Sequence, residues 1–159
     1  MIRRLRRSLR HRLVYGWFGA LMRDAVTRHP LIIGTPNPEQ RVHLGKGVQL
    51  TNVIFNVASG DITVGDYTFI AHNALLLAAT HELGHTGKAR QKAIPDAGCD
   101  IVIGRGVFVA TGATIIGPCV VGDNAVIGAG AVVAGGTVDA GTIVGGVPAR
   151  PIGMVAFAD

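Results

Sequence analysis

The sequence predicts one all-β domain in which the backbone winds into a parallel β-helix. The main observation is a six-residue repeat from residue 103 to residue 150. Neither a helical period of about 3.6 residues nor a strand period of two keeps residue types in phase in this way. Short strands joined by repeated corners do, because like positions stack from coil to coil. The first positions are Ile103, Val109, Ile115, Val121, Ile127 and Val133, and the fifth are Val107, Ala113, Cys119, Ala125, Ala131, Thr137 and Ile143.

The composition agrees with such a coil. Glycine makes up 23 of the 159 residues, roughly twice its ordinary share, without the period of three that marks collagen. Glycines of this number serve the corners, where the backbone needs unusual dihedral angles. Aromatic residues make up only 5% of the chain, which fits a narrow interior filled by valine, isoleucine, leucine and alanine.

The positive charge is concentrated at the amino end. Residues 1–28 carry eight arginines and one aspartate, a balance of +7, whereas the remainder has seven basic and nine acidic residues, a balance of −2. This distribution argues against a coil that binds nucleic acid and indicates a basic N-terminal arm. Apolar residues recur every four positions in the arm, which predicts an amphipathic helix over residues 3–26. They are Leu5, Leu9, Leu13, Trp17 and Leu21.

Two interpretations of this helix stay open. It can cap the open end of the coil, or it can lie on a membrane surface with its arginines against anionic headgroups. No run of about 18 apolar residues is present, so no transmembrane helix is expected. Charged residues at 10–12 interrupt any apolar segment near the start, which argues against a cleaved signal peptide. Two cysteines without a disulfide pattern favour the cytoplasm, with the inner membrane face as the site of any peripheral contact.

The rest of the chain divides around the repeat. Residues 29–41 form a proline-containing connector, the coil is expected over residues 42–153, and residues 154–159 form a short tail. The repeat slips by two residues across 56–61. Its large interruption is a polar, glycine-containing loop over residues 82–96. A loop this long in a tight solenoid indicates function.

Of the six histidines, His81 has the most suggestive position, because it closes the last hexad before the loop. An imidazole suits a general base since its pKa lies near neutrality. His72 is expected to face outward from the coil, and His85 lies within the loop.

Three stretches carry a resemblance to a known family. They are ITVGDYTFIAHNALLLAATH, IVIGRGVFVATGATIIGPCVVGDNAVIGAGAVV and GGVPARPIG. Over about residues 42–153 the chain resembles the hexapeptide-repeat acyltransferases, in particular the bacterial O-acetyltransferases of sugars and surface polysaccharides. The resemblance implies a left-handed coil, a homotrimer with each active site in a groove between two subunits, acetyl-CoA as co-substrate, and no metal.

The resemblance also assigns residues. It makes His81 the catalytic base and places an acceptor-binding or oxyanion-binding asparagine at Thr51 by ungapped spacing, or at Asn52 after a slip of one residue. Asn56, which borders the phase slip, is a further candidate. Glu82 and His85 in the loop are candidate acceptor contacts.

Coenzyme A contacts are implied further along the coil. Phe108 corresponds to an aromatic residue that borders the thioester groove, and Thr111 and Ala129 correspond to corners whose backbone contacts pantetheine. Arg150 corresponds to a basic residue that reaches the nucleotide phosphate. After the hexad that ends at Val133, the family often carries a lysine near the nucleotide. Here the segment beginning at Ala134 reads AGGTV and supplies no cation.

The function expected from these residues is an acyl-CoA-dependent O-acyltransferase acting on a sugar hydroxyl of a glycan, glycolipid or nucleotide sugar. Attack would be direct, since no cysteine is placed to form an acyl-enzyme. One alternative is a catalytically silent β-helix scaffold. Another is a metal-dependent hydratase resembling the γ-class carbonic anhydrases, for which His81 and His85 form an H-x3-H pair.

Overall fold

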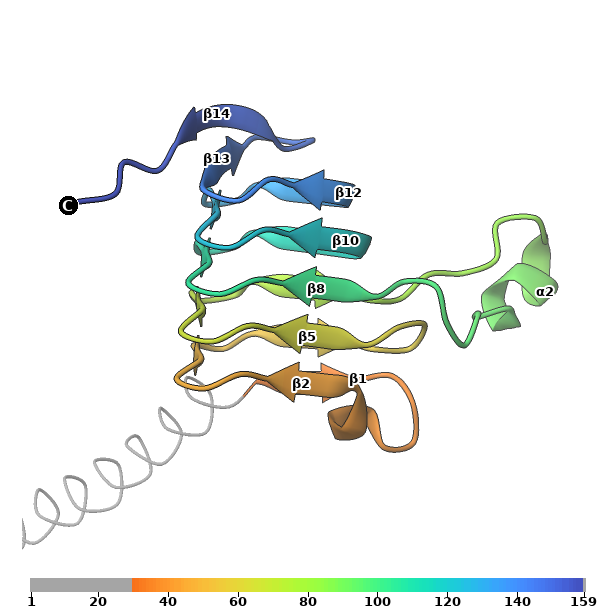
Figure 1. Ribbon diagram of the computed structural model, residues 1–159. Helices are drawn as coiled ribbons and strands as arrows, with labels where there is room; N and C mark the ends of the chain where they lie inside the picture. Colours follow the sequence, from red (N-terminus) through yellow and green to blue (C-terminus); the bar gives the residue numbers. More distant parts are fainter. Residues whose placement is uncertain (1–29, 159) are drawn as a thin grey trace, which may run out of the picture.

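The computed structural model describes residues 30–158, which form a left-handed parallel β-helix (Figure 1). The coils stack from β1 and β2 at one end to β13 and β14 at the other. The amphipathic helix predicted over residues 3–26 lies outside the described residues. Within residues 30–158, no helix has the length and apolarity needed to cross a membrane.

The strands are short, and two brief helices interrupt them. The elements are β1 (Leu31–Ile33), η1 (Pro38–Arg41), β2 (Val42–Leu44), β3 (Gln49–Leu50), β4 (Ile54–Asn56), β5 (Ile62–Val64), β6 (Phe69–Ile70), β7 (Leu75–Leu77), α2 (Gly87–Lys92), β8 (Ile101–Ile103), β9 (Phe108–Val109), β10 (Thr114–Val121), β11 (Val126–Ile127), β12 (Val132–Val138), β13 (Thr142–Gly145) and β14 (Arg150–Met154).

Hydrogen bonds between coils arrange these strands into three faces. The β5 face contains β2, β5, β8 and the second halves of β10 and β12. The β6 face contains β3, β6, β9, β11 and β13, with β14 added antiparallel to β13. The β7 face contains β1, β4, β7 and the first halves of β10 and β12. Ile101 pairs with Cys119, 18 residues later, so a regular coil takes three hexads.

The core is a column of residues inside these faces. The predicted inward positions are confirmed from Ile103 to Val133, because every one of them is at most 5% exposed. Each fully buried isoleucine, leucine or valine contributes about 1.5–3 kcal/mol to the free energy of unfolding. The repeat thus specifies the coil by stacking apolar side chains along its axis.

The predicted phase is wrong beyond Val133. Thr137 is exposed and Ile143 is only half-buried. The corner at Gly135 is one residue shorter than the corner at Gly117–Pro118 one coil earlier, so the pairing of β10 with β12 shifts register there. Three neighbouring residues therefore point inward instead: Val138, Thr142 and Val144.

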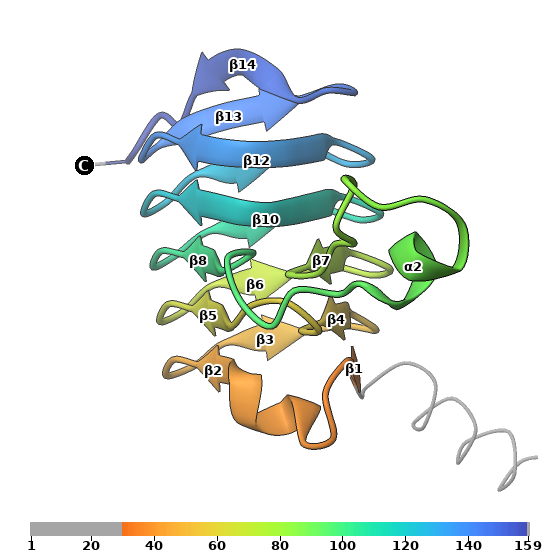
Figure 2. The same ribbon diagram turned by 90° about the vertical axis from the view of Figure 1, so that its right-hand side faces the viewer.

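The corner between the β7 and β5 faces carries both insertions of the coil, and we call it the loop corner. Val42 pairs with Ile62, 20 residues later, so the first complete coil has two extra residues, as the phase slip across 56–61 predicted. In the next coil, residues 78–100 leave the same corner as an extruded loop. Figures 1 and 2 show this loop, with α2 in it, projecting from the stack.

The connector is more regular than expected. Residues 29–41 contain β1 and η1, and β1 pairs with β4 to extend the β7 face. The three apolar residues at 31–33 explain this difference, because they lie between Pro30 and Gly34 and include neither glycine nor proline.

Candidate active site

His81 lies where the chain leaves the coil, four residues after the end of β7. The side chain is exposed, and its Nδ1 lies 3.2 Å from the backbone carbonyl oxygen of Arg90, across the loop. A carbonyl oxygen can only accept, so Nδ1 carries the proton and donates it. The neutral ring therefore presents Nε2 as an unprotonated nitrogen, which is the form that a general base requires.

The loop is closed by contacts between its two arms. The Glu82 amide donates to the carbonyl of Ala93 at 2.9 Å, where the chain returns from α2. The Arg90 guanidinium donates to the carbonyls of Leu83 and His85. These contacts bring α2 back over the residues that follow His81.

Glu82 and His85 interact with each other. His85 Nε2 lies 3.0 Å from Glu82 Oε2, and both side chains are about half exposed. His85 is therefore engaged with a carboxylate rather than turned towards His81. Among residues 30–158, no three His, Cys, Asp or Glu side chains gather in a way that could hold a metal ion.

Ser59 lies in the two-residue insertion and contacts both ends of the loop. Its hydroxyl accepts a hydrogen bond from the Thr80 amide at 3.3 Å, and its carbonyl accepts from the Cys99 amide at 3.0 Å. Ser59 is fully buried. The residue before His81 is thus attached to the preceding coil.

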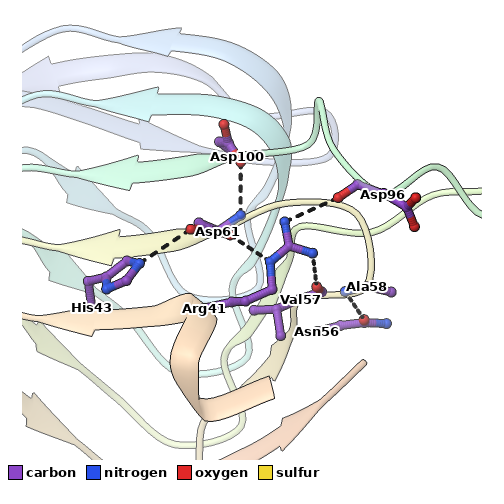
Figure 3. A network of polar contacts seen from close by, with 8 residues as sticks. All are labelled: Arg41, His43, Asn56, Val57, Ala58, Asp61, Asp96 and Asp100. Atoms are coloured by element: carbon purple, nitrogen blue, oxygen red, sulfur yellow. Dashed lines mark hydrogen bonds and ion pairs between the residues drawn. The ribbon is translucent and has the colours of Figure 1, made fainter. Parts of the chain in front are cut away.

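Arg41 fixes the same corner from outside (Figure 3). Its Nε donates to Asp61 Oδ1 at 2.6 Å, and its two terminal nitrogens donate to the carbonyls of Val57 and Asp96. His43 adds a 3.3 Å contact to Asp61 Oδ2. The hydrogen bond from Arg41 is the main cause that lowers the pKa of Asp61 below 3.8, and His43 acts in the same direction.

Ser59, Arg41 and Asp61 are not identifiable as part of this corner from the sequence alone. Arg41 reaches Asp96 across 55 residues and Ser59 reaches Thr80 across 21 residues, so no local pattern links them to the loop. The slip of phase across residues 56–61 is the signal that marks this corner.

The three candidates for acceptor binding that lie on the coil fall on two corners. Asn52 has a left-handed backbone (φ +50°), and its amide donates to Asn73 Oδ1 at 2.6 Å. It lies, with Thr51, at the corner between the β6 and β7 faces, which we call the glycine corner. Asn56 lies at the loop corner, pairs with Leu77, and accepts a hydrogen bond from the Ala58 amide. Asn56 is therefore the candidate that shares a corner with His81.

The residues expected to bind coenzyme A are also divided between sites. Phe108 faces outward on the β6 face and stacks on Phe69, with ring centroids 4.6 Å apart and planes inclined by 15°. Phe69 was not identified from the sequence, since the loop separates it from Phe108 by 39 residues. Thr111 and Ala129 are exposed at the glycine corner, two and three coils above Asn52, respectively.

Ala134 and Arg150 lie at the far end of the coil. Both line a groove of about 670 Å³ between the end of β12, β13 and β14. The Arg150 guanidinium donates to the carbonyl of Ala149 at 2.8 Å, and within residues 30–158 it forms no ion pair. The guanidinium is thus available to an anionic ligand at the groove.

The comparisons with known proteins agree with this architecture. A model of the family "Bacterial transferase hexapeptide (six repeats)" matches residues 100–135. A comparison with curated protein sequences finds no match.

Three solved structures illustrate the shared fold. A hexapeptide-repeat-containing acetyltransferase from Vibrio cholerae, also solved with acetyl coenzyme A, has a TM-score of 0.66 at 22% identity and covers 87% of this chain and 80% of its own. A galactoside acetyltransferase in complex with coenzyme A has a TM-score of 0.66 at 24% identity, covering 79% of this chain and 62% of its own. Serine acetyltransferase from Neisseria gonorrhoeae has a TM-score of 0.56 at 29% identity, covering 74% of this chain and 40% of its own.

The first two similarities, each below 25% identity, concern the fold. The family match covers the most regular part of the repeat, from β8 into β12. Residues 100–135 therefore match the hexapeptide-repeat family model, and the described part of the chain has the fold of these solved acetyltransferases.

Proposed function

We propose that this protein is an acyltransferase that moves an acyl group, most simply acetyl, from coenzyme A to a sugar hydroxyl of a glycan, glycolipid or nucleotide sugar. The observation that carries the proposal is the hydrogen bond from His81 Nδ1 to the Arg90 carbonyl, which leaves Nε2 free as a base. The acetyl donor and the galactoside acceptor are those named for structures of the same fold.

In this reaction His81 acts on the acceptor hydroxyl. Its Nε2 takes the hydroxyl proton as the oxygen bonds to the thioester carbonyl carbon. When the carbon–sulfur bond breaks, the same nitrogen returns the proton to sulfur. The products are the ester and the free thiol, so atoms and charge balance without an acyl-enzyme. Cys119 is buried and its pKa is raised to about 11, so it is unsuited to act as a nucleophile.

The glycine corner suits a long, flexible donor. A Cβ added at Gly112 or Gly130, next to Thr111 and Ala129, would meet no heavy atom within 4 Å. Exposed backbone beside open space can pair with the amides of a pantetheine arm. Phe108 with Phe69 offers an apolar surface near this corner, and Arg150 offers a cation for phosphate.

A homotrimer explains why these residues are far apart in one chain. The glycine corner and the loop corner are opposite edges of the β7 face, so Thr111 and His81 lie on either side of it. A donor held at the glycine corner would meet His81 if the loop corner of a neighbouring subunit packed there. The outward positions of the β7 face are largely apolar, which favours such packing. They include Ile54, Leu75, Leu77, Ile116 and Val132.

The test is thiol release from acetyl-CoA in the presence of a panel of glycans, with serine included as a non-sugar acceptor. We expect His81→Ala to lower kcat by about 10²- to 10⁴-fold, the usual share of a general base. Lys46→Ala is the control, because Lys46 is exposed at the corner between the β5 and β6 faces, away from both the loop corner and the glycine corner. Undiminished turnover in His81→Ala would overturn the assignment of the base.

Binding separates an enzyme from a silent scaffold. Acetyl-CoA should raise the Tm of the wild-type protein, since a ligand that binds only the folded state stabilises it. If acetyl-CoA neither raises the Tm nor releases its thiol, the result would favour the silent scaffold. Membrane contact through residues 3–26 stays a prediction from the sequence.

A further inference from the structure

Arg90 contacts the loop with both its backbone and its side chain. Its carbonyl oxygen accepts the hydrogen bond from His81 Nδ1 at 3.2 Å. Its guanidinium Nη2 donates to the Leu83 carbonyl at 2.9 Å, and its Nε donates to the His85 carbonyl. One residue therefore connects the candidate base to two backbone carbonyls in the segment that follows it.

The helix that carries Arg90 has little else to hold it in place. α2 is six residues long and none of them is buried. Its N-cap residue, Thr86, makes no side-chain capping hydrogen bond, and Gly87 begins the helix at φ +53°. A helix of this length is unstable in isolation. The position of the Arg90 carbonyl must therefore depend on contacts between the two arms of the loop.

The position of that carbonyl has a chemical consequence. A neutral histidine carries its proton on either Nδ1 or Nε2, and the hydrogen bond at one nitrogen decides which. If the carbonyl moved away, the proton would be free to occupy Nε2. In that tautomer Nε2 cannot take the proton of the substrate hydroxyl.

We propose that Arg90 is a positioning residue for His81. The Arg90 guanidinium binds the carbonyls of Leu83 and His85. These contacts fix the position of the Arg90 carbonyl, which accepts the hydrogen bond that selects the Nδ1–H tautomer of His81. A planar fork with several donors suits this task better than a lysine ammonium, because its donors have a fixed geometry. The catalytic meaning of the tautomer rests on the proposed function, but the tautomer itself does not.

The experiment compares three full-length variants with the wild type. Arg90→Met removes the guanidinium and keeps the carbonyl, while Arg90→Lys keeps the charge without the fork. Lys88→Met is the matched control, since Lys88 lies on the same helix and, within residues 30–158, its ammonium makes no hydrogen bond or ion pair. The tautomer of His81 is read from ¹⁵N NMR shifts of its neutral ring, with His81→Gln used to assign the signals.

In the wild type and Lys88→Met we expect a protonated Nδ1 and an unprotonated Nε2. In Arg90→Met we expect the two shifts to converge or exchange, and Arg90→Lys should fall in between. Thiol release should follow the same order, with kcat in Arg90→Met about tenfold lower, which corresponds to about 1.4 kcal/mol. The KM for acetyl-CoA should be unchanged.

The outcomes separate this inference from the proposed function. An unchanged Nδ1–H tautomer in Arg90→Met, or an Nε2–H tautomer in the wild type, would overturn the role of Arg90. A tautomer that shifts as expected in a protein without thiol release would support the positioning by Arg90 and contradict the acyltransferase proposal.

Discussion

In the coil, each strand is held by the coils before and after it, whereas the loop of residues 78–100 is held by a few long side chains. The coil has a continuous column of buried apolar residues and regular backbone pairing. At the loop, the side chains of His81 and Arg90 within it, and of Arg41 in η1, donate to backbone carbonyls. The coil therefore provides stability, and the loop provides chemical groups whose positions depend on individual contacts.

The largest expected difference between coil and loop is in the free energy of unfolding that is lost when a leucine is replaced by alanine. Leu76 is fully buried in β7, and Leu83 in the loop is 74% exposed. Leu76→Ala should lower the free energy of unfolding by about 2–5 kcal/mol, through lost burial and the cavity left behind. Leu83→Ala should change it by no more than about 0.5 kcal/mol.

Urea unfolding at one fixed subunit concentration measures both effects, because association would make stability depend on concentration. Equal losses in the two variants would mean that the loop is packed as tightly as the coil.

The sequence predicts these two regions to different extents, and the reason is physical. Inward residues such as Val109 and Ile115 repeat at a fixed spacing, so their burial could be read directly. Thr137 was misplaced because a corner shortened by one residue at Gly135 leaves no trace in a sequence that is rich in glycine on both sides. The period shows where an interruption lies but not what it contacts.

The candidate site shows the same limit. His81 could be identified because it borders the loop, and Asn56 because it borders the phase slip. The contacts of Arg41 with Asp96, and of Phe69 with Phe108, join residues 55 and 39 positions apart. Such pairs depend on how coils stack on either side of an insertion, which the repeat alone does not determine.

A smaller contrast is expected at two glycines. A Cβ at Gly65 in the coil would lie 2.6 Å from the backbone of Gly104 in the next coil, whereas a Cβ at Gly84 in the loop would meet nothing within 4 Å. Gly65→Ala should cost about 1–3 kcal/mol, because stacked coils cannot separate locally.

Gly84→Ala should be neutral or should stabilise by about 0.4–1 kcal/mol, since alanine restricts the unfolded chain and the native backbone there accepts it. Thermal unfolding of both variants measures this. A destabilised Gly84→Ala would show that the free loop is more crowded than its open surroundings indicate.

The smallest effect concerns two arginine–aspartate pairs. Asp61 binds Arg41 at the loop corner, and Asp123 binds Arg105 at a corner of the regular coil. Both aspartates have a pKa below the ordinary 3.8 because of these arginines. A lowered pKa in the folded state means that each carboxylate stabilises the fold at neutral pH and that this contribution is lost as pH falls through 3.8 and below.

The two pairs should nevertheless differ in what they control. At pH 7, Asp61→Asn should lower the free energy of unfolding by at most about 1 kcal/mol, as expected for a partly exposed ion pair. It should also flatten the decline in stability between about pH 5 and pH 3. Because Arg41 holds the Asp96 carbonyl, Asp61→Asn should speed amide hydrogen exchange in residues 81–96, whereas Asp123→Asn should leave that exchange unchanged. Equal exchange in the loop of both variants would show that the coil positions the loop without the Arg41–Asp61 pair.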